Sequence, residues 1–473
     1  MTGHSNKNVC GMSALWTSDE IARATGGTAS GSFEVTGVTF DSREVGPGDL
    51  FIAMPGTAHD GHQFVPQAIA SGASGLIVSQ PVDAPHVLVE DTAQALQGLG
   101  RASRERSQGT IIGVTGSVGK TSTKEALFAA LDRWRPRKVH RSVKSYNNDT
   151  GVPLSLARMP REAEFAVLEM GMNHAGEIAA LTRLARPDLA LITTIAPAHI
   201  ENLGSEEAIA DAKAEIFEGL EPDGIAVIPN DTPHRDRLLR AARRYADRIV
   251  TFGGGDADVH ALHAVRADEG GSLVTAALLE SELTFTLSQR GEHWVSNALA
   301  VLAVVEALGG DVGLAGLALA EMGGLKGRGE RHWIEVDGGK ALLIDESYNA
   351  NPASMAATLK SLGSEIGVER RIAVLGPMRE LGTHSDALHA DLASSVQDAK
   401  VDRLILVGDE TRPLEHALNG AVAITQVSDA DQAADALERL LRPGDAVLVK
   451  ASNSVGLARV VERLREGVAC STS

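Results

Sequence analysis

The amino-acid sequence predicts a protein of the α/β class, organised as three α/β domains, and three observations support this prediction. The chain has 473 residues, of which 43% are hydrophobic, enough for several hydrophobic cores. Short apolar runs alternate with helix-like stretches along most of the chain, which is typical of parallel sheets covered by helices. A glycine-rich loop stands between one such run and the next helix-like stretch, as in a phosphate-binding strand–loop–helix unit.

The first domain is expected to span residues 12–107 and to mix short strands with helices. Alternating or wholly apolar stretches predict strands at residues 35–40, 51–54 and 75–78 and a helix at residues 67–73. The polar stretch R-A-S-R-E-R-S-Q-G at residues 101–109 is either a domain boundary or the exposed end of a helix. We favour the boundary, because a new strand–loop–helix unit begins just after it.

The central domain is expected at residues 108–325 and should contain a mostly parallel sheet. Its strands are predicted at residues 110–114, 165–170, 189–193 and 226–229, and their almost continuous apolar character indicates a sheet buried on both faces. Residues 283–288 instead alternate strictly between apolar and polar side chains, which fits an antiparallel addition to that sheet. A helix is expected to follow from about residue 294 to residue 308.

The third domain is expected at residues 326–473 and begins within a glycine-rich segment. The string G-G-L-K-G-R-G at residues 323–329 is interpreted as a hinge. Strands are predicted at residues 341–345, 372–375, 403–407 and 446–450, with helices between them. The last part of the chain therefore repeats the α/β pattern.

Composition argues against several classes of protein. Lys and Arg number 44 against 62 Asp and Glu, and the net charge of −18 argues against a nonspecific nucleic-acid or membrane-surface binder. The two cysteines, Cys10 and Cys470, indicate a reducing cytoplasm and no disulfide framework. No signal-like segment opens the chain, and the longest apolar run, residues 298–305, is too short for membrane insertion. Residues 1–11 are expected to be a tail before a helix-like segment that opens at Met12.

The most informative motif is the string G-V-T-G-S-V-G-K-T-S-T-K at residues 113–124. In such a loop, small residues let backbone N–H groups approach phosphate oxygens, Lys120 reaches the terminal phosphates and the Thr121 hydroxyl can hold Mg²⁺. The strict pattern would have glycine in place of Val114, whereas the inner glycine here is Gly116. The alternative is a glycine-rich turn with an incidental lysine, which the position of G-K-T-S-T at a strand–helix junction disfavours.

Two further polar residues are expected beside this loop. Glu169 ends one apolar run and His199 follows another, and in parallel sheets ligands bind outside the carboxyl ends of the strands. Together with Thr121 they could complete a Mg²⁺ shell, and the preference of Mg²⁺ for oxygen favours the glutamate over the histidine. The alternatives are a helix-capping glutamate and a buried, hydrogen-bonded histidine.

Lys213 is unusual because it stands on the apolar face of a predicted helix. Its neighbours three and four positions away are Ile209, Ala210, Ile216 and Phe217, and side chains at these spacings share a face. The lysine either extends off the edge of that face or is desolvated with a lowered pKa. A neutral amine can react with CO₂ to form a carbamate, which can bind Mg²⁺ as a carboxylate does, but spacing alone does not establish this.

These motifs together resemble the Mur ligases, the ATP-dependent family that forms amide bonds in peptidoglycan synthesis. The resemblance runs from about residue 16 to residue 465. It rests on the strings D-S-R-E-V-G-P-G-D-L-F-I-A-M-P-G-T-A-H-D-G-H (41–62), T-G-S-V-G-K-T (115–121), N-N-D-T-G-V-P (147–153), L-E-M-G-M-N-H-A-G-E-I (168–178), A-H-I-E-N-L-G-S (198–205), A-K-A-E-I-F (212–217) and D-E-S-Y-N-A-N-P-A-S-M (345–355).

The resemblance implies an N-terminal uridine-nucleotide domain, a central phosphate-loop ATPase domain and a C-terminal Rossmann-like domain, with a catalytic set of Lys120, Glu169, His199, Lys213 and Arg328. The ATP-binding residues it implies are Thr115, Gly116, Ser117, Val118, Gly119, Lys120, Thr121, Asn297, Arg328, Asp345 and Asn349. Thr121, Glu169, His199 and Lys213, the last as a carbamate formed with CO₂, would hold two Mg²⁺ ions. The uridine nucleotide is expected at Ser42, Arg43, Asp60, Gly61 and His62, and the acceptor peptide at Asn147, Asn148 and Asn173.

Within the family, M-N-H-A-G-E-I and S-Y-N-A-N-P-A-S-M resemble the members that add D-alanyl-D-alanine to a UDP-N-acetylmuramoyl-tripeptide through an acyl phosphate. The UDP-N-acetylmuramoyl-tripeptide and D-alanyl-D-alanine are therefore the expected small-molecule partners. The protein is expected to be cytoplasmic and monomeric. Two departures concern the choice of dipeptide: Pro377 replaces the usual aspartate of G-D-M-x-E-L-G, and Ala451 and Asn453 stand where K-G-S-R is usual. Four alternatives stay open: a ligase that adds the third residue, although its D-N-P-R box is absent, a folylpolyglutamate synthase, a phosphate-loop NTPase switch and an inactive scaffold.

Overall fold

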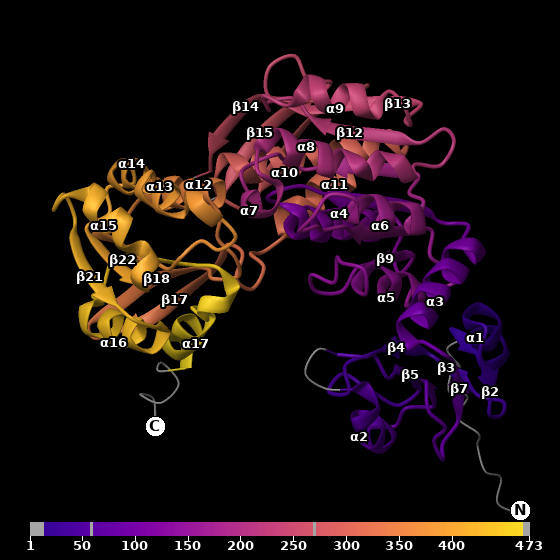
Figure 1. Cartoon of the computed structure of the whole chain (residues 1–473). Helices are drawn as coiled ribbons and strands as arrows, with labels where there is room; N and C mark the ends of the chain where they lie inside the picture. The colour runs from indigo at the N-terminus through magenta and orange to yellow at the C-terminus, as the bar shows by residue number, and fades with distance from the viewer. Residues whose placement is uncertain (1–13, 57–59, 268–270, 467–473) are drawn as a thin grey trace, which may run out of the picture.

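The computed structural model describes residues 14–56, 60–267 and 271–466, and its strands form three large sheets in three lobes (Figure 1). The predicted tail at residues 1–11, Met12 and both cysteines lie outside the described residues. The fold class is α/β, as predicted. In the described part of the chain, no helix is long and apolar enough to cross a membrane.

The N-terminal lobe is built on a five-stranded sheet in the order β2-β7-β6-β5-β4, parallel except for β2. Its elements are β1 (Trp16–Thr17), α1 (Ser18–Thr25), β2 (Thr28–Ala29), β3 (Glu34–Val35), β4 (Gly37–Thr39), β5 (Asp49–Ile52), a 3₁₀ turn (Gly61–Phe64), α2 (Val65–Ala70), β6 (Gly75–Val78), β7 (His86–Leu88) and α3 (Thr92–Arg106). The predicted strand at residues 35–40 is divided, because β3 pairs with β1 and only β4 joins the large sheet. Ile21 and Leu99 from the helices pack with Leu50 of the sheet.

Helix α3 joins this lobe to the next. Its first turn is capped by Asp91, whose carboxylate accepts hydrogen bonds from two backbone N–H groups. Residues 101–106 of the polar stretch continue this helix, as the alternative interpretation expected. Near its end, the buried Arg104 donates hydrogen bonds to the carbonyls of Ala185 and Arg186 in the central lobe.

The central lobe is built on a nine-stranded sheet in the order β16-β15-β14-β13-β12-β11-β8-β10-β9. Its strands are β8 (Thr110–Thr115), β9 (Val139–Arg141), β10 (Phe165–Glu169), β11 (Leu189–Ile192), β12 (Ile225–Pro229), β13 (Arg248–Gly253), β14 (Val259–Arg266), β15 (Ser272–Ala277) and β16 (Glu282–Leu287). The strands from β9 to β14 are parallel, and β15 and β16 are antiparallel, as the alternation at residues 283–288 predicted.

Helices cover both faces of the central sheet, which explains its almost wholly apolar strands. One face packs against α4 (Lys120–Trp134), α10 (Glu292–Ala307) and α11 (Val312–Glu321). The other packs against α5 (Gly151–Ala157), α6 (Glu177–Ala185), α8 (Glu206–Ala214), a 3₁₀ turn (Glu215–Gly219) and α9 (Arg235–Ala242). Along β10, Val167 belongs to the first apolar cluster, whereas Ala166 and Leu168 belong to the second, so successive side chains enter opposite cores.

The C-terminal lobe is built on a six-stranded sheet in the order β17-β18-β22-β19-β20-β21, parallel except for β17. Its strands are β17 (Glu330–Val336), β18 (Gly339–Glu346), β19 (Arg370–Leu375), β20 (Arg403–Val407), β21 (Ala423–Val427) and β22 (Asp445–Lys450). Its helices are α12 (Pro352–Gly363), α13 (Ser385–Ala390), α14 (Leu392–Asp398), α15 (Arg412–Leu418), α16 (Ala430–Leu440) and α17 (Ala458–Glu466). They cover both faces and form two apolar cores, and Figure 1 shows this lobe beside the central one.

Candidate active site

The glycine-rich loop connects the end of β8 to the start of α4, and its geometry requires glycine. Gly116 has φ +148° and Gly119 has φ +87°, conformations that side chains of L-residues rarely adopt. An added Cβ would lie 1.9 Å from Thr193 Oγ1 at the first position and 2.8 Å from Asn297 Oδ1 at the second. No side chain caps α4, so the N–H groups of its first turn are free to bind an anion.

Neighbouring side chains hold the loop in this form. Ser117 Oγ donates to the Ala196 carbonyl (2.9 Å), and Thr193 Oγ1 donates to the Val118 carbonyl (2.5 Å). Lys120 Nζ folds back onto the Gly116 carbonyl at 2.8 Å. The loop is therefore pre-organised by the segment after β11, the strand adjacent to β8 in the sheet.

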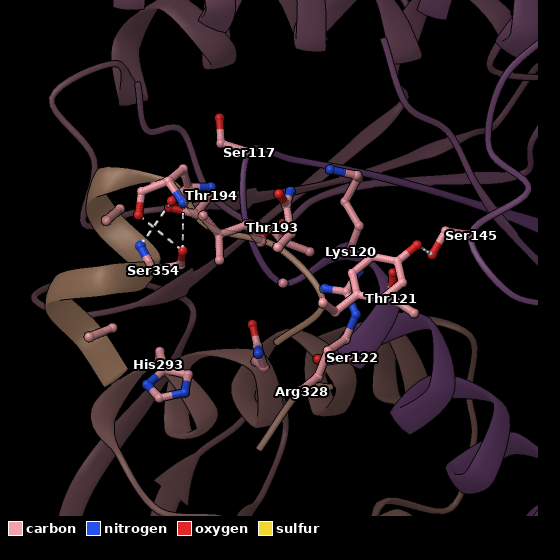
Figure 2. Close-up of a pocket in the computed structure, with 18 of the residues that line it drawn as sticks. Ser117, Lys120, Thr121, Ser122, Ser145, Thr193, Thr194, His293, Arg328 and Ser354 are labelled. Carbon is pink, nitrogen blue, oxygen red and sulfur yellow. Dashed lines mark hydrogen bonds between the residues drawn. The ribbon is translucent and has the colours of Figure 1, made fainter. Parts of the chain in front are cut away.

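A cavity of about 560 Å³ opens between this loop and the C-terminal lobe. Figure 2 shows Lys120 and Thr121 at the start of α4, with Arg328 and Ser354 contributed by the C-terminal part of the chain. Twelve of the predicted site residues line it: Ser117, Val118, Gly119, Lys120, Thr121, Asn147, Glu169, Asn173, His199, Asn297, Arg328 and Asn349.

Glu169 lies at the end of β10 with its side chain 1% exposed. Its Oε1 accepts a hydrogen bond from Asn147 Nδ2 (2.8 Å), whereas its Oε2 is buried and has no hydrogen-bond partner among the described residues. The nearest cation is Lys124, whose Nζ lies 3.9 Å from Oε2 and donates to the carbonyls of Ser142 and Lys144. A buried carboxylate oxygen without a donor is costly, and a cation in the cavity would satisfy it.

Mg²⁺ fits this arrangement of residues. In the described part of the chain, no three Asp, Glu, His or Cys side chains lie close enough together to hold a metal by themselves. Mg²⁺, however, is usually bound through one or two carboxylates together with substrate phosphates and waters. The unpartnered oxygen of Glu169, in a cavity that Thr121 and the phosphate loop also line, meets that requirement.

Lys213 on α8 is 1% exposed and does not extend off the edge of its helix. Its neighbours along the chain, Ile209 and Ile216, belong to an apolar cluster of the central lobe, and Lys213 does not line the cavity. Burial, and secondarily the charge of Lys120, hold the pKa of Lys213 well below its usual range. Burial also lowers the pKa of Lys120, with Glu169 acting in the opposite direction.

His199 stands just before α7 (Ile200–Leu203) with a left-handed backbone, φ 61°. Its side chain is 22% exposed and lines the cavity, and its Nδ1 faces the carboxylate of Glu380 from the C-terminal lobe. The contact with His199 is the main cause that lowers the pKa of Glu380. The imidazole is thus held by a residue that lies 181 positions further along the chain.

The predicted hinge at residues 323–329 forms a turn held by the buried Asp345. Its carboxylate accepts hydrogen bonds from the Gly327 N–H (2.9 Å) and from Ser347 Oγ (2.6 Å), and it does not line the cavity. Arg328 stacks over the Tyr348 ring at 4.1 Å, and the Tyr348 hydroxyl donates to Ser145 Oγ of the central lobe (2.7 Å). The turn and the central lobe are therefore linked at the cavity wall.

The remaining predicted residues lie outside the cavity. Thr115 ends β8 and Gly116 opens the loop, and neither lines the cavity. Asn148 caps the turn before α5 by accepting a hydrogen bond from the Gly151 N–H. Ser42, Arg43, Asp60, Gly61 and His62 belong to the N-terminal lobe, where they follow the carboxyl ends of β4 and β5. His62 links Asp60 Oδ1 (2.6 Å) to the Ser79 N–H (2.9 Å), whereas Ser42 bonds to Gln67 and Arg43 to Asp41.

Comparison with known proteins places these features in a family. Three family models match the chain: "Mur ligase family, catalytic domain" at residues 34–104, "Mur ligase middle domain" at 114–305 and "Mur ligase, glutamate ligase domain" at 327–453. A UDP-N-acetylmuramoyl-tripeptide–D-alanyl-D-alanine ligase of Synechocystis sp. is 37% identical over 444 residues, which cover 92% of this chain and 93% of that protein. The chain belongs to the Mur ligase family.

Further relatives agree with this assignment. A ligase of the same name from Bacillus subtilis is 36% identical, with 95% of this chain and 98% of that protein covered. The crystal structure of MurF from Acinetobacter baumannii superposes with a TM-score of 0.82 at 30% identity, over 95% of this chain and 99% of the other. That of MurF ligase from Thermotoga maritima in complex with ADP gives 0.77 at 29% identity, over 93% and 99%. The predicted family resemblance is confirmed.

Sequence reasoning missed several residues of this Mur ligase that line the cavity or contact the residues that line it. Lys124, one helical turn after Lys120, could have been singled out because residues four apart share a face of α4. Lys450 lines the cavity, where its Nζ donates to the Asn349 carbonyl (2.9 Å) and lies 3.5 Å from Glu346 Oε2. Glu380 stands in the G-P-M-R-E-L-G string at residues 376–382, but that string did not indicate that the packing of two lobes brings it to His199.

Proposed function

We propose that this Mur ligase uses ATP to join D-alanyl-D-alanine to a UDP-N-acetylmuramoyl-tripeptide, giving the pentapeptide precursor of peptidoglycan, ADP and phosphate. One observation carries the proposal: two lobes bring a phosphate loop, a buried carboxylate and an arginine to the same cavity. The similarity to ligases of this name over nearly the whole chain supports the choice of substrates.

The chemistry starts from a carboxylate, which is a poor acyl donor at neutral pH. Transfer of the γ-phosphoryl group of ATP to the tripeptide carboxylate gives an acyl phosphate with a good leaving group. Lys120, Arg328 and the N–H groups at the start of α4 would neutralise the negative charge on the transferring group, so the residues act by positioning and electrostatics. The dipeptide amine then attacks the acyl carbon, and the tetrahedral intermediate expels phosphate.

Binding of nucleotide and acceptor is assigned to the predicted residues. We propose that Asn297, which lies against Gly119, reads the adenine, and that Ser117, Val118, Asn349 and the other loop residues bind the remainder of ATP. Asn147 and Asn173, on the cavity wall, are proposed to face the acceptor peptide, with Asn148 beside them. Thr115, Gly116 and Asp345 are proposed to act indirectly. The first two would shape the phosphate loop, and Asp345 would hold the hinge turn.

Mg²⁺, when bound, supplies a positive charge that offsets the charge of the phosphates. We propose Thr121, Glu169 and His199 as its protein ligands, and the orphaned Oε2 of Glu169 supports this choice. We further propose that Lys213 reacts with CO₂ and, as a carbamate, holds a second Mg²⁺. The buried amine with its lowered pKa supports carbamate formation, because only the neutral amine attacks CO₂.

The N-terminal lobe is proposed to bind the uridine nucleotide of the acceptor through Ser42, Arg43, Asp60, Gly61 and His62. These residues follow parallel neighbouring strands, whose carboxyl ends meet at one edge of a sheet. We propose domain limits at residues 12–107, 108–325 and 326–473, since each range contains one large sheet. A cytoplasmic monomer is proposed, because two cysteines in 473 residues suit a reducing compartment and the proposed catalytic residues all come from one chain.

Phosphate release from ATP and Mg²⁺ tests the function. It is measured with UDP-N-acetylmuramoyl-tripeptide, with and without D-alanyl-D-alanine, and the product is analysed by mass. Release that needs both substrates and yields the pentapeptide supports the proposal. Release that responds to a free amino acid in place of the dipeptide assigns the chain to a ligase of an earlier step. Release indifferent to both indicates a phosphate-loop NTPase switch.

A further inference from the structure

The loop that carries Glu380 docks on the segment that carries His199. His199 Nδ1 faces the Glu380 carboxylate, and the Glu201 N–H donates a hydrogen bond to the Glu380 carbonyl at 3.3 Å. A Cβ added to Gly382 would lie 3.0 Å from Glu201 Cγ, so the two segments are in close contact there. Ile200 packs against the apolar core of the C-terminal lobe. The contact is thus a packed junction between two lobes.

Both facing residues have backbones that non-glycine residues rarely adopt. His199 has φ 61° and Glu380 has φ 64°. Such conformations persist where the surroundings impose them, and they gather at functional sites. The Glu380 loop is held from its own side as well, because the Met378 N–H donates to His389 Nε2 (3.0 Å) and the Arg379 N–H donates to Ser452 Oγ (2.9 Å).

The contact leaves a single ring nitrogen of His199 for the cavity. His199 Nδ1 is buried and lies against the Glu380 carboxylate, but the two groups are not aligned as a hydrogen bond in this structure. A proton on Nδ1 would be attracted by that carboxylate, which would leave Nε2 as the lone-pair donor. His199 and Glu169 both line the cavity. Histidines that bind metals usually donate their other ring N–H to a carboxylate or carbonyl, which orients the ring.

We propose that Glu380 is a positioning residue that fixes His199 for metal binding, so that docking of the C-terminal lobe completes the metal site. This inference rests on the proposed role of His199 as a Mg²⁺ ligand. It goes beyond that role by assigning a function to a residue of another lobe, Glu380, which does not itself line the cavity. Docking of the C-terminal lobe at the cavity would therefore also orient His199 toward the Mg²⁺ ion that accompanies ATP.

The test measures how tightly Mn²⁺, used as a probe for Mg²⁺, binds to the full chain and to its variants. Binding is followed by electron paramagnetic resonance in the presence of a non-hydrolysable ATP analogue. Glu380→Ala should weaken Mn²⁺ binding by about 10–100-fold. Glu380→Gln should weaken it less, because the amide oxygen still accepts a hydrogen bond from Nδ1–H. Glu410→Ala is the matched control: Glu410 lies in a 3₁₀ turn (Asp409–Thr411) of the same lobe, is 43% exposed against 48% for Glu380, and pairs with Arg379.

His199→Ala and the double variant with Glu380→Ala complete the cycle. If Glu380 acts through the histidine, the double variant should bind Mn²⁺ no more weakly than His199→Ala. In turnover, Glu380→Ala should raise the KM for ATP-Mg²⁺ and leave the KM for the dipeptide unchanged. Unfolding by urea, measured alongside, should be equal for the alanine variants of Glu380 and Glu410.

The possible outcomes distinguish the positioning role of Glu380 from the proposed metal site on which that role depends. Mn²⁺ affinity of Glu380→Ala within twofold of the parent, while His199→Ala binds weakly, would overturn the role of Glu380 and leave the metal site standing. Parent-like affinity in both His199→Ala and Glu169→Ala would instead overturn the metal site itself.

Discussion

Replacing Gly116 by alanine is expected to disrupt the phosphate loop, because an added Cβ collides with Thr193. The Cβ would lie 1.9 Å from Thr193 Oγ1, which has to retreat by roughly 1.5 Å to reach van der Waals contact. That hydroxyl donates to the Val118 carbonyl (2.5 Å) and lies 3.3 Å from the Thr115 carbonyl. The retreat therefore breaks the contacts that hold the loop.

The expected loss has two parts. A side chain at φ +148° costs about 1–3 kcal/mol in backbone strain. Leaving a buried carbonyl without its donor costs about 1–3 kcal/mol more. If this free energy is lost from the binding-competent loop, the affinity for ATP falls by roughly 30-fold at the lower bound and about 10⁴-fold at the upper.

Isothermal titration with ATP and Mg²⁺ measures this loss, and urea unfolding measures the change in stability. Gly176→Ala is the matched control, because Gly176 has φ +88° and an added Cβ there meets nothing within 4 Å. It should report backbone strain alone and keep the affinity for ATP. Parent-like ATP affinity in Gly116→Ala, with no more destabilisation than in Gly176→Ala, would refute the reasoning.

Three further perturbations test other parts of the molecule. Lys213→Ala should abolish ligation, and a short carboxylic acid such as acetate should restore part of the phosphate release by supplying the missing carboxylate. Glu365→Ala should lower the free energy of unfolding in urea by about 3–5 kcal/mol, because this carboxylate, 2% exposed, pairs with Arg290 and Arg331 at the junction of two lobes. Burial lowers the pKa of His140 from 6.5 to about 4, so below pH 6.5 the unfolded chain binds a proton that the folded chain does not. The free energy of unfolding should therefore fall by about 2 kcal/mol between pH 7.5 and pH 5, and His140→Gln should lessen that fall.

Each of these predictions has a contradicting outcome. Full activity of Lys213→Ala would end the carbamate hypothesis. A loss for Glu365→Ala as small as that for Glu292→Ala, whose pair with Lys360 is exposed and is expected to contribute about 0–1 kcal/mol, would show that the buried cluster is not stabilising. An equal pH dependence of stability in the parent and in His140→Gln would remove the histidine as its cause.

The fold was most predictable where a strand is buried on both faces. Residues 75–78 and 403–407 are predicted strands that coincide with β6 and β20, because short apolar runs bounded by polar residues or glycine are typical of strands buried on both faces. The prediction was poorer at residues 35–40, where alternation suits any half-buried strand. There the chain divides between two sheets, a choice made by pairing partners distant in sequence.

The candidate site was predictable where function depends on local chain geometry. The loop at residues 116–121 needs glycine for its backbone and a lysine at a helix start, and these requirements are written in consecutive residues. Glu169 was predictable for a related reason, since it ends a strand beside that loop. Whether Glu169 binds a metal, and what each residue contributes to the reaction, stays a prediction.

What the sequence by itself determined is the α/β class, the order of strands and helices, the phosphate loop and the membership of the Mur ligase family. These depend on periodicity, on backbone conformation and on short motifs, which are properties of neighbouring residues. Only the tertiary structure decided that Glu380 faces His199, that Tyr348 bonds to Ser145 and that Asp345 supports the hinge turn from behind. These contacts arise when separate lobes pack or a chain turns back on itself, and their energy depends on distances in space that spacing along the chain does not encode.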